Sequence, residues 1–299
     1  MMRLAAVGGA FLIGCALALP AAAERIVHVV APNDADPSVT QFLRNSVVMF
    51  ERAVSGSAPL LVYLPGTGGD PARVQLFLGV AVDVGYRAIA LSYNNEPAVM
   101  QVCSRQPDPS CSENFRSSRL FGGPDTPPQE SVVARLTKLL QFLDLRAPEE
   151  GWRAYLAGGA PNWQRIAVAG HSQGGGMAAL LAKRMAVARV ILLSGPPDWV
   201  MPGRDPAPWL GAAGATPTDR WYGLYHRDEQ LAPALQRAYA ALGLTGSNIR
   251  VVNLTPAVEV TSSFDPYHVS VAADRVTPKA ADGSASYVAD WGFLLGPAR

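Results

Sequence analysis

The sequence predicts an α/β fold: a single domain of about eight mostly parallel strands with helices on both faces of the sheet. Apolar runs of strand length alternate along the chain with stretches of helical periodicity, the pattern of a parallel sheet covered by helices. The run Leu60–Leu64 is apolar at every position, as in a strand buried on both faces. No linker or internal repeat interrupts this order, so we expect one domain over residues 24–299.

The expected elements follow one another in chain order. Apolar runs predict strands over residues 25–30, 47–51, 60–64, 87–93, 165–169, 188–193, 221–225 and 249–254. Helical spacing of apolar residues predicts helices over residues 71–84, 127–143, 175–186, 233–242 and 287–295.

Two helix starts have local signals. Asp70 is an N-cap residue before Pro71, and proline suits the first helical position. Thr126 and Gln129 stand at capping-box spacing before the second helix. Residues 94–125, which lie before that helix, are expected to be irregular. The apolar face of the second helix is expected to consist of Val132, Leu136, Leu139, Leu140 and Leu143.

Residues 1–23 read as a secretory signal peptide. A positive start at Arg3 precedes the apolar run Leu4–Leu19, and Pro20 is followed by small residues that suit cleavage near Ala23. The mature protein is then expected to begin near Glu24 and to be secreted or periplasmic.

Two alternatives exist for this leader. A transmembrane anchor is disfavoured, because the run is short and no later segment is long and apolar enough to span a bilayer. Attachment as a lipoprotein through Cys15 is suggested by the box Leu12–Cys15, but the apolar residues 16–19 that follow are unlike a polar tether.

The two remaining cysteines, Cys103 and Cys111, flank a proline-rich turn. In an oxidising compartment such neighbours pair, so we expect a disulfide rather than two free thiols.

The composition excludes several function classes. Of 299 residues, 49% are hydrophobic and 16% charged, which excludes a disordered chain. The formal net charge of +1 excludes a nucleic-acid binder that acts through a basic surface. No metal-ligand motif such as His-Glu-X-X-His and no P-loop occurs in the sequence, so we expect neither a metal nor another cofactor.

The motif that carries chemistry is Gly-X-Ser-X-Gly at Gly170–Gly174. It stands directly after an expected strand and before an expected helix, with Ser172 at the turn. A nucleophile on so sharp a turn needs a strained backbone, and Gly170 and Gly174 remove bulk that would collide across it. The helix start places free amides where negative charge develops on a substrate.

This stretch resembles the nucleophile elbow of α/β-hydrolases, whose esterases and lipases commonly carry Gly-His-Ser-Gln-Gly. The resemblance implies an α/β-hydrolase fold over most of residues 25–295 and a Ser–acid–His triad in chain order. It also implies an oxyanion hole of two backbone amides. We expect one from Gln173 and one from Thr67, in the Gly-rich turn after the third strand.

Chain order selects the base. Of the four histidines, His28 precedes the elbow, His171 lies inside it and His226 ends a strand. Only His268 follows the last strand, where the family carries its base.

The acid has several candidates. Asp228 is the first choice and Glu229 the second, because both follow the strand 221–225, where the family usually carries the acid. Asp198, after the preceding strand, competes with them. Asp265 lies close to His268 in sequence, at a spacing that more often serves a turn.

These residues predict a secreted serine hydrolase that cleaves a small-molecule or polymeric carboxylic ester through an acyl-enzyme. A peptidase, thioesterase or acyltransferase, or a binding protein without catalysis, are the alternatives on the same fold. Residues 94–125 and 196–219 are placed to roof Ser172, and the tryptophans of the second segment either line the site or pack the loop. The sequence does not define the acyl or alcohol specificity or the oligomeric state.

Overall fold

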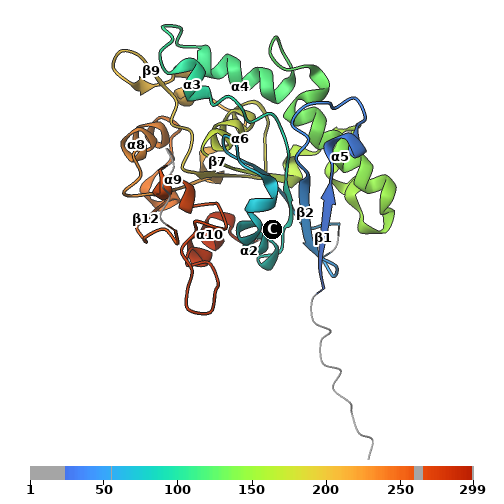
Figure 1. The fold of residues 1–299 in the computed structure, drawn as a ribbon. Helices are drawn as coiled ribbons and strands as arrows, with labels where there is room; N and C mark the ends of the chain where they lie inside the picture. The colour runs from blue at the N-terminus through green and yellow to red at the C-terminus, as the bar shows by residue number, and fades with distance from the viewer. Residues whose placement is uncertain (1–23, 55, 259–264, 298–299) are drawn as a thin grey trace, which may run out of the picture.

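The computed structural model describes residues 24–54, 56–258 and 265–297. These residues form an eight-stranded sheet that is covered by helices (Figure 1). The strand order is β1-β2-β4-β3-β7-β8-β11-β12. The pairs β1–β2 and β2–β4 are antiparallel and the other pairs are parallel, so the predicted sheet is confirmed. Its strands are β1 (Arg25–Val30), β2 (Ser46–Glu51), β3 (Leu60–Leu64), β4 (Arg87–Ala90), β7 (Ile166–His171), β8 (Arg189–Leu193), β11 (Trp221–His226) and β12 (Ile249–Val252).

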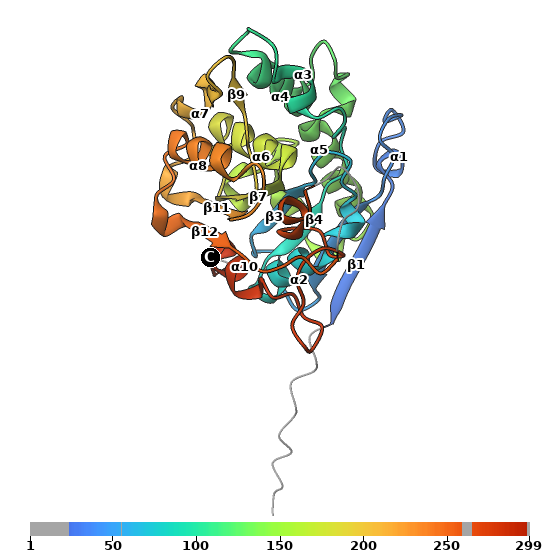
Figure 2. The same cartoon turned by 60° about the vertical axis from the view of Figure 1, so that its left-hand side comes forward.

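Helices cover both faces of the sheet. The helices α2 and α10 pack on one face, and α4, α5, α6 and α8 lie over the other, as Figures 1 and 2 show. Each face has its own apolar core, because residues of the parallel strands alternate between the two sides. The longer helices are α2 (Gln75–Asp83), α4 (Cys111–Phe121), α5 (Val132–Arg146), α6 (Gln173–Arg184), α8 (Ala232–Ala241) and α10 (Val288–Leu295).

The shorter elements lie in the loops between these. They are the helices α1 (Pro32–Ala35), α3 (Val99–Cys103), α7 (Pro208–Gly211) and α9 (Pro266–Ser270), and two small hairpins, β5 (Leu156–Ala157) with β6 (Ala160–Pro161) and β9 (Trp199–Val200) with β10 (Asp205–Pro206).

Position in the sheet explains the character of each strand. Every residue of β3 and β4 is buried, as expected for central strands covered on both faces. The edge strand β1 instead alternates between exposed and half-buried residues, and Val27 and Val29 face solvent. Strand β7, which pairs with β3, is buried in the same way except at its last residue, His171.

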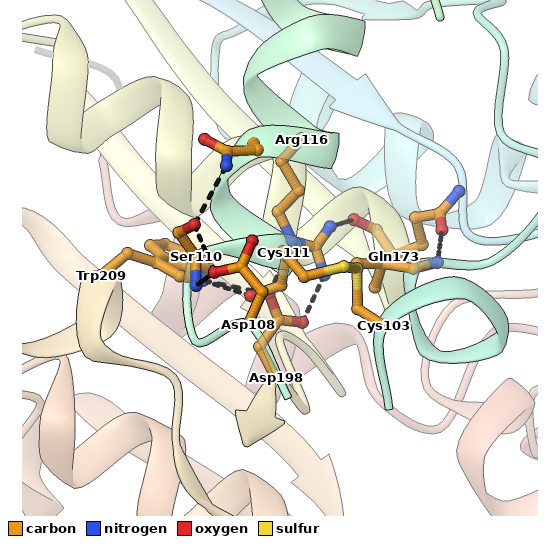
Figure 3. The surroundings of a disulfide bond; sticks show 11 residues. Cys103, Asp108, Ser110, Cys111, Arg116, Gln173, Asp198 and Trp209 are labelled. Atoms are coloured by element: carbon orange, nitrogen blue, oxygen red, sulfur yellow. Dashed lines mark hydrogen bonds and ion pairs between the residues drawn. A yellow bond between two sulfur atoms is a disulfide. The ribbon is translucent and has the colours of Figure 1, made fainter. Parts of the chain in front are cut away.

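The expectation that residues 94–125 are irregular is wrong. This segment forms α3 and α4, and the predicted disulfide between Cys103 and Cys111 joins them (Figure 3). Helix α4 is rich in serine and arginine, and two of its buried residues are Arg116 and Arg119. A helix whose buried face contains guanidinium groups lacks the apolar stripe by which helical periodicity is recognised in a sequence.

The cap of the second predicted helix is also corrected. Thr126 precedes a short 3-10 turn, Pro128–Glu130, which contains Gln129, and α5 begins only after Ser131. The hydroxyl of Ser131 accepts the hydrogen bond of the Ala134 amide at 3.3 Å, the N-cap contact. The predicted apolar face of α5 is buried as expected.

The leader, with its expected cleavage near Ala23 and the alternative anchor Cys15, lies outside the described residues. Among the helices that the structure describes, none is long and apolar enough to cross a bilayer. Within the same residues, no group of three or more His, Cys, Asp or Glu side chains is gathered as metal ligands would be.

Candidate active site

Ser172 stands in a strained turn between β7 and α6. Its backbone angles are φ 53° and ψ −116°, a conformation that a residue with a side chain rarely adopts. The flanking glycines make the turn feasible. A Cβ atom on Gly170 would lie 2.2 Å from the Gly174 oxygen, and one on Gly174 would lie 1.9 Å from the Leu64 oxygen. The predicted role of both glycines therefore matches the local geometry.

A buried carboxylate–imidazole pair joins the loop after β11 to α9. Oε2 of Glu229 contacts Nδ1 of His268. The other oxygen, Oε1, accepts hydrogen bonds from Ser194 Oγ at 2.7 Å and from the His226 amide at 2.9 Å. The Glu229 side chain is fully buried and that of His268 is 13% exposed. A carboxylate with both oxygens engaged holds the imidazole in a fixed orientation.

The structure corrects the choice of Asp228 as the partner of His268. The Asp228 side chain is 47% exposed and lies 3.5 Å from Nε of Arg227 and 4.0 Å from Nδ1 of His226. Its amide donates to Nδ1 of His226 at 3.0 Å, which places the carboxylate on the outside of the loop. Glu229, the second choice from the sequence, is the residue that points inward.

Asp265 positions the helix of His268. Its Oδ1 accepts the amides of Tyr267 at 3.0 Å and His268 at 3.4 Å, so it caps α9. Its Oδ2 accepts the Gln230 amide at 2.6 Å, which ties α9 to the loop that holds Glu229. Asp265 thus has a local backbone role as the N-cap of α9.

His268 also lies against the residue next to Ser172. The rings of His171 and His268 have centroids 4.8 Å apart, and Nε2 of His171 donates to the His268 carbonyl oxygen at 2.9 Å. Because a carbonyl only accepts, His171 carries its proton on Nε2. The elbow, the buried acid and the histidine after the last strand thus form one contact network.

In the turn after β3, several carbonyl groups accept hydrogen bonds, whereas the amide of Thr67, among the described residues, remains free to bind a substrate. Pro65 O accepts from Tyr93 Oη at 2.7 Å, and Gly66 O accepts from Asn95 Nδ2 at 2.8 Å. Gly68 O accepts from Arg44 Nη1 at 2.5 Å. Within the described residues, the Thr67 amide has no hydrogen-bond acceptor of its own.

This turn lies directly against the elbow. A Cβ atom on Gly66 would come within 3.2 Å of the Ser172 Cβ. Gln173, the first residue of α6, has an amide without an intrahelical acceptor, as at every helix start. The Gln173 side chain accepts the Val99 amide at 2.6 Å and donates to Asn95 O at 2.8 Å, so both of its polar atoms are engaged.

A cleft of about 650 Å³ opens beside the turn, and we call it the Thr67 cleft. The turn itself and His171 form one wall. Apolar side chains, among them Val74 and Val269, form much of the rest. This volume is within the range of roughly 300–1,000 Å³ for small-molecule sites.

The order of the sheet and the position of the elbow decide the fold. Ser172 ends β7, an inner strand of the sheet, while Glu229 follows β11 and His268 follows β12, the last strand. A nucleophile elbow, then an acid, then a histidine in chain order is the arrangement of one fold. The fold is an α/β-hydrolase fold.

No protein-family model and no curated protein matches the sequence. Similar solved structures include a protein assigned as a dienelactone hydrolase from Klebsiella pneumoniae subsp. pneumoniae (14% identity, 77% of this chain and 85% of that chain, TM-score 0.39). An esterase from Lactobacillus rhamnosis inhibited by a tributyrin phosphonate is similar at 14% identity (75% and 73%, TM-score 0.42). A dienelactone hydrolase-like promiscuous phosphotriesterase from metagenomic libraries is 15% identical (92% and 99%, TM-score 0.44).

A buried ion pair supports the elbow of this α/β-hydrolase fold (Figure 3). Nε and Nη2 of Arg116 bind the two oxygens of Asp198 at 2.8 and 2.5 Å, and neither side chain is exposed. Nη1 of Arg116 donates to Gln173 O at 2.8 Å. Trp209 donates to Asp198 at 3.2 Å and is itself buried, so it packs this loop. Asp198, the competing acid, is thus bound to Arg116.

Sequence reasoning did not identify three residues that hold the site together. Ser194 bonds to Glu229, Asn95 holds the turn after β3, and Arg116 joins α4 to the start of α6. A positional signal existed only for Ser194, because it directly follows the strand predicted over residues 188–193. The other two lie in segments without a recognisable motif.

The elbow histidine gives the protein a pH-dependent stability. Burial, with His268 close by, lowers the pKa of His171 to about 3. The unfolded chain binds a proton at this residue below about pH 6.5, and the folded chain does so only below about pH 3. Stability therefore rises with pH across this window, by at most about 1.4 kcal/mol per pH unit from this residue.

We expect His171→Gln to remove this contribution. Urea unfolding at pH 4, 5, 6 and 7 should give a free energy of unfolding that rises less steeply in the variant than in the unmodified protein. Parallel curves for the two proteins would show that His171 does not titrate in this way.

Proposed function

We propose that the protein is a secreted serine hydrolase that cleaves carboxylic esters through an acyl-enzyme. The observation that carries the proposal is the buried pair of Glu229 and His268, held against an elbow whose serine has a strained backbone. Burying a carboxylate is energetically unfavourable, and the packing of a core does not require it. A buried carboxylate aligned with a histidine is therefore typical of a functional site.

In the first half of the reaction, Ser172 Oγ attacks the ester carbonyl carbon while His268 Nε2 takes the hydroxyl proton. Nδ1 of His268 faces Glu229, so Nε2 is the nitrogen left for the serine. Glu229 stabilises the imidazolium that forms. The amides of Thr67 and Gln173 bind the oxyanion of the tetrahedral intermediate.

The first half ends when His268 returns its proton to the leaving alcohol, which departs and leaves the acyl group on Ser172. The second half repeats these steps with water. A water molecule then attacks the acyl carbon as His268 takes one of its protons. As the second intermediate breaks down, the bond from the acyl carbon to Ser172 Oγ breaks and His268 returns its proton to Oγ, which releases the acid and regenerates Ser172. No cofactor is needed for any of these steps.

Two features support the proposal that this enzyme is exported. The leader of residues 1–23 has the character of a signal peptide. The disulfide between Cys103 and Cys111 suits an oxidising compartment, where such bonds persist.

Ser172→Ala tests the proposed nucleophile. We expect kcat for p-nitrophenyl butyrate to fall by at least about 10³-fold, because no other group forms the acyl-enzyme. The far-ultraviolet circular dichroism should be unchanged, since alanine occupies no more space than serine. Full hydrolysis by the purified variant would exclude Ser172 as the nucleophile.

A further inference from the structure

The charges around the Thr67 cleft are strongly one-sided. Arg44, Arg73 and Arg275 all line it, and Asp70 is the only acidic residue among its described lining residues. This local excess of positive charge contrasts with a formal net charge of +1 for the whole chain. The three guanidinium groups come from three distant parts of the sequence and are assembled at one site by the fold.

Two carboxylates beside the cleft, those of Asp70 and Asp274, are committed to the backbone. Asp70 Oδ1 accepts the Ala72 amide at 2.9 Å. The carboxylate of Asp274 accepts the amides of Gln75 at 2.8 Å and Leu76 at 2.9 Å, at the start of α2. The Asp274 amide in turn donates to Arg73 O at 2.9 Å, which fixes the segment of Arg275 next to Arg73.

The arginines themselves remain available. Within the residues that the structure describes, the side chains of Arg73 and Arg275 form no ion pair or hydrogen bond, and both are exposed. Arg44 uses Nη1 on Gly68 O and Gly69 O of the turn, and no described carboxylate pairs with it. Guanidinium groups bind carboxylates and phosphates in bidentate geometry.

We infer that the Thr67 cleft selects esters that carry an anionic group, a carboxylate or a phosphate, at the end of an apolar body. Val74, Val269 and Val276 of the cleft pack the apolar part, and Arg73 and Arg275 bind the charged end. Thr67 lines the same cleft, so in this inference the body of the ester occupies the cleft and its carbonyl group reaches the Thr67 amide at the edge. This inference rests on the proposed esterase function.

A charge series on one acyl skeleton tests it. The substrates are p-nitrophenyl butyrate, mono-p-nitrophenyl glutarate, p-nitrophenyl 4-phosphonobutyrate and p-nitrophenyl 4-(trimethylammonio)butyrate. Phenyl butyrate and 4-carboxyphenyl butyrate test the alcohol side in the same way. We expect kcat/KM to be about 10-fold higher for an anionic ester than for its neutral analogue, and lowest for the cationic ester. The carboxylate and phosphonate arms distinguish the two anions.

The variant Arg73→Gln/Arg275→Gln should reduce the ratio of anionic to neutral kcat/KM to about 1–2. Arg237→Gln, an exposed arginine of α8 outside the cleft, should keep the full ratio. The ratio should also fall between 20 and 500 mM NaCl, because exposed charges are screened. Circular dichroism checks that each variant is folded.

Equal kcat/KM for neutral and anionic esters on both the acyl and the alcohol side would overturn the inference, as would a preference that survives the double arginine variant. If Ser172 is still required for the neutral ester in that case, the proposed function stands and only the substrate class is wrong. If Ser172→Ala hydrolyses the esters like the unmodified protein, the proposed function itself fails.

Discussion

Replacing Glu229 by glutamine is expected to lower kcat by roughly 10³- to 10⁴-fold with little change in stability. The glutamine oxygen can keep the hydrogen bonds from Ser194 and His226, but its amide nitrogen must then face His268 Nδ1. A donor at that position forces the imidazole to carry its proton on Nε2. His268 can then no longer accept the serine proton, and no negative charge stabilises an imidazolium.

Asp228→Asn is the matched control. It changes the neighbouring carboxylate in the same way, but this side chain is half exposed and lies outside the pair. We expect kcat within about 2-fold of the unmodified protein, measured with p-nitrophenyl butyrate. A large loss in Asp228→Asn together with normal turnover in Glu229→Gln would reverse the assignment of the acid.

Asp198→Asn is expected to lower the free energy of unfolding by about 3–5 kcal/mol. The change leaves the Arg116 guanidinium buried without a counter-charge, and breaking a buried ion pair from one side has an effect of this size. Urea unfolding at constant pH measures it directly. Because a domain is stable by only roughly 5–15 kcal/mol, the effect should be plain.

The double variant Arg116→Met/Asp198→Leu provides the comparison. It removes both charges and fills similar volume, so its loss of stability should be smaller than that of Asp198→Asn alone. A free energy of unfolding for Asp198→Asn within about 1 kcal/mol of the unmodified protein would contradict the account of this pair. A selective loss of kcat with unchanged stability would instead indicate that Asp198 acts as the acid of the triad.

The sheet and the nucleophile turn could be predicted because their signals are local. Continuous apolar runs such as Leu60–Leu64 are required by burial on both faces, and all eight predicted strands are present in the sheet. The glycines at 170 and 174 are required by contacts of about 2 Å across the turn. These constraints act within a few residues and leave a pattern in the sequence.

The acid and the support of the elbow depend on contacts between distant residues. Asp228 and Glu229 are neighbours in a loop, and the hydrogen bonds to Ser194 and His226, not chain order, decide which one turns inward. Helix α4 was missed because it buries Arg116 against Asp198, and the sequence of such a helix looks polar. The arginines of the Thr67 cleft are scattered along the chain, and only the fold brings them together.

Covalent labelling with a fluorophosphonate tests the central claim most directly. The reagent reacts with a serine only where a base and an oxyanion site activate it. We predict one adduct per chain in intact mass, located by peptide mapping on Ser172, with loss of esterase activity in step with labelling. Ser172→Ala should take up no reagent, and Glu229→Gln should react far more slowly. An adduct on another residue, or esterase activity that persists in fully labelled protein, would contradict the account.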